Sequence, residues 1–332
     1  MALAFIEHPF FKQKQLLIIE KSSKSVNDKT WCFWEIGTSK WDEIAKKTWK
    51  KGCFISPEEH IDLDLGQYRY KQIAASDFYT YAFQKINTSA NITTIQAEVF
   101  SVKSMDDQRV IETSLAKFYT PLVFDSRPPE KLIPENSPYL LQHFKGCFVR
   151  TNKPVFDPTR FIMMDYRVTD QQQTNFIYVL PKNKHEALIE HTYFNTSLVN
   201  ENNYDAEIAQ YLSVQFQLTD DDYTIVDTER GIIPMNTFPY HKTSEKGYLP
   251  IGTRGGWVKP STGYSFKNAE RMAQKVVYNL ANGKEPGDKL IHARFRWYDS
   301  VFIKVLYYYN NKGPKVFAKF YKSNATPMLF KF

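Results

Sequence analysis

Cysteine is rare in this 332-residue chain, and long apolar runs are absent from it. The three cysteines, Cys32, Cys53 and Cys147, are odd in number and widely spaced. They suggest neither a disulfide framework nor a zinc site, so a reducing cytoplasm is the expected setting. The longest aliphatic run, residues 16–19, is far too short to span a bilayer. Met1 is not followed by the basic and apolar regions of a secretion signal.

Glycine is also scarce, with 13 residues, and it is unevenly placed. No glycine precedes Gly37, so the G-x-G-x-x-G loop that opens a dinucleotide-binding fold has no counterpart near the start. Between 252 and 263, by contrast, glycines cluster and run into an apolar pattern of helical spacing. Without a Cβ, such a loop lets the backbone approach a planar ligand or phosphate, and the helix start favours anions. An ordinary turn before a helix is the alternative.

The overall composition is that of a folded globular protein, with 42% hydrophobic and 24% charged residues. A chain of this length is expected to form about two domains. The net charge of +7 is mild and no stripe of Lys and Arg stands out in the body of the chain, so we expect no nucleic-acid partner. Basic residues become denser in 302–324, among Phe, Tyr and Leu. This mixture suits an anionic membrane surface, and a packed helix with a solvated lysine face is the alternative.

The order of expected elements predicts an α/β fold with an antiparallel insert. A strand over 15–20 ends in Glu20, where dinucleotide-binding folds place the acid that binds ribose. Further along, a helix is expected over 68–85 and strands over 92–102, 109–113, 118–125, 161–168, 175–180 and 187–195. A helix near 205–216, a strand over 223–228 and C-terminal helices complete the chain. Strand–helix alternation at both ends of an antiparallel meander indicates two intertwined domains.

The segment 187–195 carries the clearest candidate for acid–base chemistry. Strand alternation places Glu190 on one face together with Leu188, Thr192 and Phe194. A carboxyl between apolar neighbours has its charged form disfavoured, so its pKa rises and it can act as an acid near neutral pH. A half-exposed strand glutamate is the plain alternative. The surrounding order H-E-x-x-x-E-H fits no zinc motif, and we expect no metal site.

Several short segments combine into a family pattern. The chain resembles the bacterial (Bacteroidetes-type) lycopene β-cyclases in the following segments, which occur in this order: NDKTWCFWE (27–35), VFDSRP (123–128), LQHFKG (141–146), FDPTRFIMMDYRV (156–168), FIYVLP (176–181), LIEHTYF (188–194), ERGIIPM (229–235) and KPSTGYSF (259–266). The first and last of these are the most specific, and the resemblance covers nearly the whole chain.

The resemblance implies a flavoprotein with a Rossmann-like FAD/NAD(P)-binding domain, an antiparallel β-sheet substrate domain and C-terminal helices. It implies an isomerase that uses reduced FAD, with NAD(P)H as the reductant, in carotenoid biosynthesis. The linear ends of lycopene would be protonated and closed to β-ionone rings, giving γ- and β-carotene. Glu190 matches the acid of the family's L-x-E-x-T pattern. The implied partners are a linear carotenoid and a membrane surface, with peripheral attachment to the inner membrane, and no protein partner is implied.

The resemblance also assigns binding residues and domains. The residues expected to bind FAD are Glu20, Lys29, Asp125, Gly252, Gly255, Gly256, Pro260 and Gly263. Those expected to line the substrate site are Trp31, Trp34, Tyr178 and Tyr264. The FAD-binding domain would occupy residues 1–129 and return in 231–283, with the substrate domain in 130–230 and a helical, membrane-facing segment in 284–332.

Two departures from the family pattern concern FAD. Lys29 stands where the family usually has Arg, which keeps the charge but loses a bidentate phosphate contact. The family's first strand and glycine loop have no counterpart, so we expect the chain to begin inside the helix that follows that loop. The alternatives are an FAD-dependent monooxygenase or other oxidoreductase on the same fold, and an inactive, truncated carotenoid-binding remnant.

Overall fold

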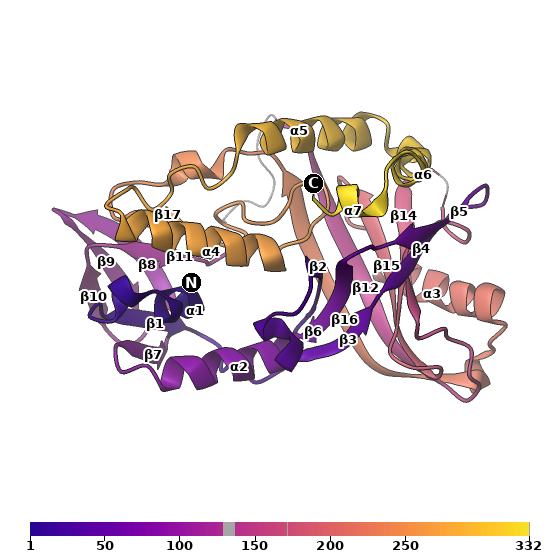
Figure 1. Ribbon diagram of the computed structural model, residues 1–332, viewed down its shortest axis with the longest axis horizontal. Coiled ribbons are helices and arrows are strands. Elements are labelled where there is room, and N and C mark those ends of the chain that lie inside the picture. The colour runs from indigo at the N-terminus through magenta and orange to yellow at the C-terminus, as the bar shows by residue number, and fades with distance from the viewer. Residues whose placement is uncertain (129–136, 171, 332) are drawn as a thin grey trace.

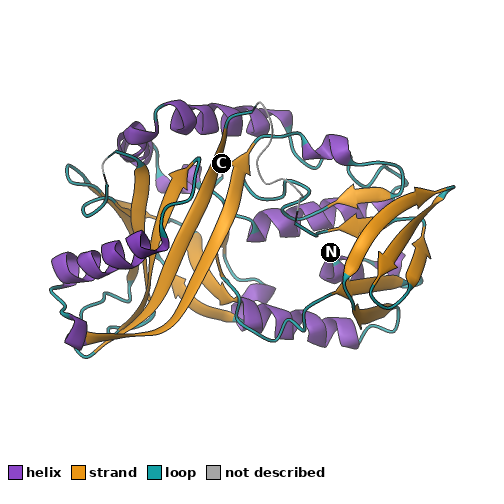
Figure 2. Cartoon of the chain, turned by 180° about the vertical axis from the view of Figure 1, so that it is seen from behind, coloured by secondary structure: helices purple, strands orange, loops and turns teal. Residues whose placement is uncertain are grey.

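The structure, a computed structural model, describes residues 1–128, 137–170 and 172–331. The molecule is elongated, with a smaller mixed α/β part around the N-terminus and a larger part built on one long sheet (Figure 1). Helix α5 (Ala293–Tyr308) lies along one side of the molecule, as both views show (Figures 1 and 2).

Two pairs of parallel strands organise the smaller part. Strand β1 (Leu16–Glu20) pairs with β7 (Ile92–Gln96), and β11 (Val123–Asp125) pairs with β17 (Tyr248–Pro250). Around them lie three helices and an antiparallel three-stranded sheet: α1 (Ala2–Glu7), α2 (Ala75–Asn87), α4 (Phe266–Ala281), β8 (Val99–Met105), β9 (Gln108–Thr113) and β10 (Lys117–Thr120). Residues far apart in sequence share one core here: Phe5, Phe11, Leu249, Trp257, Met272 and Val276. Parallel strands combined with helices are typical of dinucleotide-binding folds.

A seven-stranded sheet forms the larger part, in the order β16-β12-β15-β14-β13-β4-β5. Neighbouring strands are antiparallel except β13 and β4, which are parallel. The strands are β4 (Lys51–Ile55), β5 (His60–Asp64), β12 (Tyr139–Thr151), β13 (Arg160–Asp165), β14 (Thr174–Pro181), β15 (Glu186–Asn195) and β16 (Tyr223–Asn236). The three strands expected between 161 and 195 are confirmed, with small shifts at their ends. Strand β12 was not expected, and β16 is longer than the predicted 223–228.

The two faces of this sheet differ. Helix α3 (Glu201–Phe216), predicted near 205–216, covers one face and packs on Ile177 and Ile189. The opposite face carries Leu188 and Phe194 and faces the rest of the molecule. Alternation along β15 is therefore as predicted, because an antiparallel strand buried on both faces still sends successive side chains to opposite sides.

The expected helix over 68–85 is wrong in its first half. Residues 68–74 form strand β6 (Tyr68–Ala74), the centre of a second sheet between β2 (Thr30–Ile36) and β3 (Ala45–Trp49), and α2 begins only at Ala75. Tyr70 and Ile73 are fully buried and lie in different core clusters. Pairing on both edges and packing on both faces override local helix propensity here. Most of the segment 27–35 belongs to β2 of this sheet, and its polar first residues, 27–29, precede the strand.

The C-terminal helices complete the core of the larger part. Helices α5, α6 (Gly313–Ser323) and α7 (Thr326–Leu329) pack on the side of the long sheet that lies opposite α3. Ile303, Leu306 and Phe317 join Phe54 and Phe161 in one apolar cluster. None of the helices in the described part of the chain combines the length and apolar character that crossing a membrane requires.

Candidate active site

A cavity of about 1770 Å³ lies between the long sheet, the β2-β6-β3 sheet and α4. Its wall includes the glycine-rich loop 252–265 and aromatic side chains from β2, β6 and β14. It thus lies between the smaller, mixed α/β part of the molecule and the apolar face of the long sheet. A volume of this order exceeds the roughly 300–1,000 Å³ typical of drug-sized ligand sites, so there is room for two large molecules.

Glycine is needed at several positions of the loop 252–265. Gly256 and Gly263 have φ of +68° and +72°, which side chains rarely adopt. A Cβ on Gly255 would collide with the carbonyl oxygen of Pro250, and one on Gly263 would collide with the side chain of Gln142. The loop then enters α4, whose N-cap position, Ser265, makes no side-chain capping bond. The loop therefore lines the cavity just before a helix, and its glycines let it pack tightly against Pro250, Tyr240 and Gln142.

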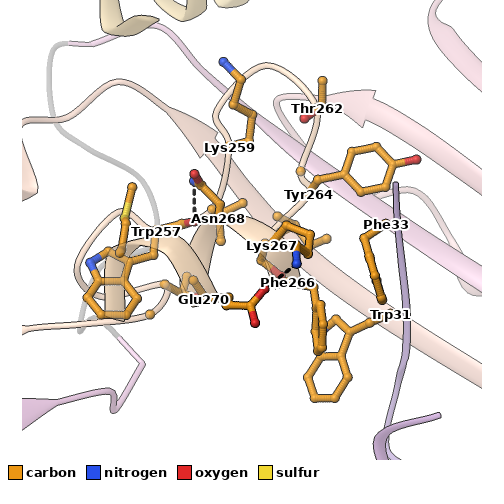
Figure 3. Close-up of a pocket in the computed structure, with 18 of the residues that line it drawn as sticks. Trp31, Phe33, Trp257, Lys259, Thr262, Tyr264, Phe266, Lys267, Asn268 and Glu270 are labelled. Carbon is orange, nitrogen blue, oxygen red and sulfur yellow. Dashed lines mark hydrogen bonds and ion pairs between the residues drawn. The ribbon is translucent and has the colours of Figure 1, made fainter. Parts of the chain in front are cut away.

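Three polar atoms near this loop are buried and lack a protein partner among the described residues. They are Oγ of Ser261, Nε1 of Trp257 and Oε1 of Gln142, and all three side chains line the cavity. Leaving such a group unpaired costs roughly 1–3 kcal/mol, so a native fold usually supplies a partner. The three side chains lie beside the loop (Figure 3 shows Trp257 and the loop from Lys259 to Tyr264), but the unpaired atoms themselves have almost no accessible surface.

Glu20 and Lys29 both reach the cavity wall. The Glu20 carboxylate, at the end of β1, accepts bonds of 3.0 Å from the backbone N–H and hydroxyl of Ser22 and lies 3.5 Å from the Lys24 ammonium. Burial raises its pKa, but these contacts outweigh burial and hold it below its usual range. The Lys29 ammonium lies 3.4 Å from Asp28. The Glu20 carboxylate is therefore ionised where the sequence predicted the acid that binds ribose, and Lys29 lies on the same cavity wall.

Asp125 is not one of the described residues that line the cavity. Its carboxylate is buried at the end of β11 and accepts bonds from Arg127 Nη2 at 2.7 Å and from the Tyr248 hydroxyl at 2.8 Å. Burial raises its pKa, but the Arg127 contacts win and keep the carboxyl ionised. Asp125 therefore links the strand pair β11–β17 to the loop that follows β11. All the other residues assigned to FAD or substrate line the cavity.

Glu190 projects from β15 into the cavity. Its carboxyl oxygen Oε1 accepts a bond of 2.7 Å from the Thr192 hydroxyl. Burial, and then the nearby carboxylate of Glu229, raise its pKa to about 8. The side chain is shielded from bulk solvent but retains access to the cavity. Glu190 is therefore protonated near neutral pH and can donate a proton to a molecule in the cavity.

Aromatic side chains form the wall beside Glu190. Tyr178 lies directly opposite Glu190 on β14, and its hydroxyl contacts that of Tyr70, which bonds Tyr264 at 2.8 Å. Burial raises the pKa of all three phenols well above their usual range, so they stay neutral. Trp34 packs on Tyr264 with ring centres 4.5 Å apart. Trp31 contacts Phe266 at the start of α4, and Figure 3 shows these rings with Phe33 and Tyr264 beside the loop.

Sequence reasoning missed Glu229, Gly146 and Tyr70. Glu229 belongs to the segment 229–235 that carried part of the family resemblance, yet it was assigned no role. Gly146 is paired with Glu190 on one side and with Glu229 on the other. Extending the predicted strand from 223–228 to 223–236 would have placed Glu229 on a strand. Its position near Glu190 could not have been predicted in this way, because it depends on the pairing of β12 with both β15 and β16.

Comparison with known proteins agrees with this geometry. The family model described as "Lycopene cyclase protein" matches residues 11–328. A lycopene beta-cyclase of Paracoccus sp. (strain N81106 / MBIC 01143) is 30% identical over 161 residues, and the match covers 47% of this chain but only 40% of that protein.

Solved structures show the same fold at low identity. A geranylgeranyl bacteriochlorophyll reductase-like protein of Thermoplasma acidophilum gives a TM-score of 0.62 at 11% identity, covering 99% of this chain and 86% of the other. A flavoprotein/dehydrogenase of Cytophaga hutchinsonii gives 0.60 at 12% identity, covering 99% and 87%. The fold is thus that of the flavoproteins, and the match of the family model over nearly the whole sequence shows that the chain belongs to the lycopene cyclase family.

Proposed function

We propose that the protein cyclises the linear ends of a C40 polyene such as lycopene to β-ionone rings, giving γ- and β-carotene without net oxidation or reduction. The observation that carries this proposal is Glu190, a carboxyl with a pKa of about 8 inside a large, mainly apolar and aromatic cavity. A carboxyl that is still protonated at neutral pH can transfer its proton to a double bond of a hydrocarbon, which has no other group to accept it. The membership of the family agrees with this chemistry.

FAD would occupy the glycine-rich end of the cavity. Gly252, Gly255, Gly256, Pro260 and Gly263 would lie against the cofactor. Glu20 would bind ribose hydroxyls and Lys29 a phosphate. When bound, reduced FAD supplies an electron-rich ring that stabilises a neighbouring cation without net electron transfer, and NAD(P)H is the proposed reductant.

The protein's own side chains account for the proton chemistry. Glu190 donates its proton to the terminal double bond of the polyene, and the ring closes through a carbocation. The neutral rings of Trp34, Tyr178 and Tyr264 face the same space and favour a cation over their π-systems. The apolar walls exclude water, which would otherwise trap the cation as an alcohol.

A membrane surface is the proposed source of the substrate. Helix α5 exposes Arg294, Trp297, Val301, Lys304 and Tyr308, which recur at helical spacing along one face. The opposite face of α5 is buried in the core through Ile303 and Leu306. An exposed stripe of basic and aromatic residues binds the interface of an anionic bilayer, such as a bacterial inner membrane.

The proposal is tested in a bacterial host that accumulates lycopene. Expression of the unsubstituted chain is expected to convert lycopene to cyclic products, and Glu190→Gln to lower the conversion by roughly 10²–10⁴-fold, the usual contribution of a general acid. Glu186→Gln is the matched control, since Glu186 lies on the same strand in ion pairs with Arg150 and Lys182, away from the cavity. Full activity of Glu190→Gln would remove the assigned role.

A second candidate is an oxidoreductase of the same fold. Solved structures of this fold include pqsL of Pseudomonas aeruginosa, described as a probable FAD-dependent monooxygenase, with a TM-score of 0.59 at 10% identity. Consumption of NAD(P)H in proportion to product, with oxygen in the product, would favour this candidate. An isomerase consumes only the reductant needed to keep the flavin reduced. Carotenoid binding without any conversion by the unsubstituted chain would instead favour a non-catalytic binding protein.

A further inference from the structure

Two carboxyl side chains face each other across a glycine on the long sheet. Glu190 on β15 and Glu229 on β16 are each paired with Gly146 on the strand between them, β12. Residues directly opposite in antiparallel strands share a face, so both glutamates project to the cavity side, with backbones roughly 10 Å apart across two strand spacings. Both line the cavity.

Gly146 keeps the space between the two carboxyls open. A Cβ at this position would lie 3.2 Å from Cγ of Glu229, 3.7 Å from Cβ of Glu190 and 2.9 Å from a methyl group of Leu188. A side chain at this position would therefore push Leu188 aside and crowd Glu229, while its contact with Glu190 would be an ordinary one. The glycine leaves both carboxyls accessible from the same stretch of cavity.

The two carboxyls are held by different parts of the molecule. Glu190 accepts its bond from Thr192 on its own strand. Glu229 Oε2 accepts a bond of 2.7 Å from the hydroxyl of Thr30, on β2 of the second sheet. Hydrogen bonds from a hydroxyl favour the ionised form of the acceptor. The structure thus fixes two separate carboxyls rather than a single pair sharing one hydrogen bond.

Charge coupling gives the pair different protonation states. Burial is the main cause that raises the pKa of both, and for Glu190 the charge of Glu229 adds to it. Asp227, on the strand of Glu229, also raises the pKa of Glu229, and the two glutamates in turn raise the pKa of the Cys32 thiol on β2. The charge of Glu229 raises the pKa of Glu190, whereas Glu190 is not among the groups that raise the pKa of Glu229, so Glu229 is the carboxyl that ionises first.

We propose that Glu229 is the base that removes the proton from the closed ring, so that Glu190 and Glu229 divide the acid and base roles of the cyclisation. The inference rests on the proposed function and adds a second catalytic residue to it. Its basis is the placement of both carboxyls on one cavity wall, on either side of Gly146, with Thr30 holding Glu229.

The step balances as an isomerisation. The O–H bond of Glu190 breaks and a C–H bond forms at C2 of the linear end, leaving a cation at C1. The C5=C6 electron pair forms the C1–C6 bond and moves the cation to C5. The C6–H bond then gives its electron pair to a new C5=C6 bond, and its proton passes to Glu229. Exchange with water as the product leaves restores both carboxyls, and no electrons are gained or lost.

The position of the base decides which ring is made. The C5 cation has hydrogens on three neighbouring carbons: loss from C6 gives the β-ring, loss from C4 the ε-ring, and loss from the C5 methyl group the γ-ring. A fixed carboxylate selects one of these. Without this carboxylate, the cation loses whichever hydrogen lies near another, weaker proton acceptor. The proportions of the three ring types in the product therefore report directly on the base.

Glu229→Gln tests the inference through the ring type of the product. In lycopene-accumulating cells and with purified protein, total cyclisation is expected to fall by roughly 10²-fold. The share of ε- and γ-rings, measured by chromatography and NMR, is expected to rise at least several-fold over the unsubstituted protein. Glu229→Asp keeps a carboxylate and should restore the β-ring. Only β-rings from Glu229→Gln, at any rate of conversion, would overturn the assignment.

A second pair of variants keeps the test decisive if Glu229→Gln does not fold. Thr30→Val removes the donor to Glu229 and should move the acidic limb of the pH–rate profile to higher pH, because ionised Glu229 becomes harder to form. Thr192→Val, the matched control, should instead move the basic limb upward through Glu190. An unmoved acidic limb in Thr30→Val contradicts the base role. If the unsubstituted chain forms no ring at all, the proposed function itself fails, which is a different result.

Discussion

Lys259 and Asp299 form an ion pair of 2.5 Å that ties the glycine-rich loop to helix α5. Asp299 is buried, at 2% exposure, and Lys259 lies at the start of the segment 259–266 that carries the family resemblance. Burial lowers the pKa of Lys259 and Asp299 counteracts this. The loop that borders the cavity is therefore anchored to a helix that reaches the molecular surface.

Replacing only the cationic partner of this ion pair is expected to destabilise the fold. Lys259→Met leaves the Asp299 carboxylate buried without its cation, and losses of this kind amount to roughly 3–5 kcal/mol in the free energy of unfolding. Urea unfolding followed by circular dichroism measures the change. The double variant Lys259→Met with Asp299→Leu should recover most of it, because no charge is left buried.

The exposed pair Lys246–Asp107, with both side chains more than four-fifths exposed, is the control for this experiment. Lys246→Met should leave the unfolding curve unchanged. An equal loss in Lys246→Met and Lys259→Met would show that burial of Asp299 does not cause the effect.

The stability of the protein should also report the buried state of Glu190. A carboxyl whose folded pKa is about 8 stabilises the fold fully below its unfolded pKa and loses that contribution as pH rises toward 8. Glu190→Gln removes this loss. It should therefore match the unsubstituted protein near pH 4 and exceed it near pH 9, by roughly 2 kcal/mol after allowing for contact with cavity water.

Denaturant unfolding at both pH values measures this difference. Glu186→Gln should show no such gain, because ion pairs with Lys182 and Arg150 hold the pKa of Glu186 below its usual range. A Glu190→Gln variant less stable than the unsubstituted protein at pH 9 would contradict the burial of this carboxyl.

The sequence predicted the acid but not its partner, and the reason is physical. Alternation along one strand is a local property, so the face of Glu190 followed from 187–195 alone. The position of Glu229 depends on the pairing of β16 with β12, across more than eighty residues of chain. The spacing of apolar residues within one segment and its secondary-structure propensity carry no information about pairing between distant strands.

One other expectation failed for a related reason. Residues 68–74 were predicted as helix, but pairing with β2 and β3 on both edges makes them a strand. The assignment of Asp125 to FAD stays a prediction, and in the structure its carboxylate accepts a bond from Arg127, two residues on. The glycine positions were more predictable, because positive φ and close backbone approach restrict the residue type locally. The four-part domain division at 129, 230 and 283 stays a prediction.

Gly263 should be required for flavin binding. Its φ of +72° and the collision of a Cβ with Gln142 both oppose a side chain at this position. Gly263→Ala is expected to weaken FAD binding by at least about 10-fold, since even one misplaced contact of about 1.4 kcal/mol has this effect. Quenching of flavin fluorescence on titration measures the affinity.

Gly283→Ala is the matched control for this variant. Gly283 has a φ of +65°, close to that of Gly263, but no atom lies within 4 Å of a Cβ built there. It shares the backbone strain without the collision. Equal losses of FAD affinity in the two variants would assign the effect to general destabilisation.

The exposed face of α5 should mediate attachment to membranes. Trp297 is 62% exposed and Tyr308 is 65% exposed on this face, which also carries the basic residues Arg294 and Lys304. Replacing both rings by alanine should lower binding to vesicles containing anionic lipid several-fold, because aromatic rings at the interface and basic side chains act together. Vesicle co-sedimentation at low and high salt measures binding. Phe100→Ala, at an equally exposed position on β8 (63%), should leave it unchanged. If the α5 variant binds as the unsubstituted protein does, the substrate must reach the cavity by another face.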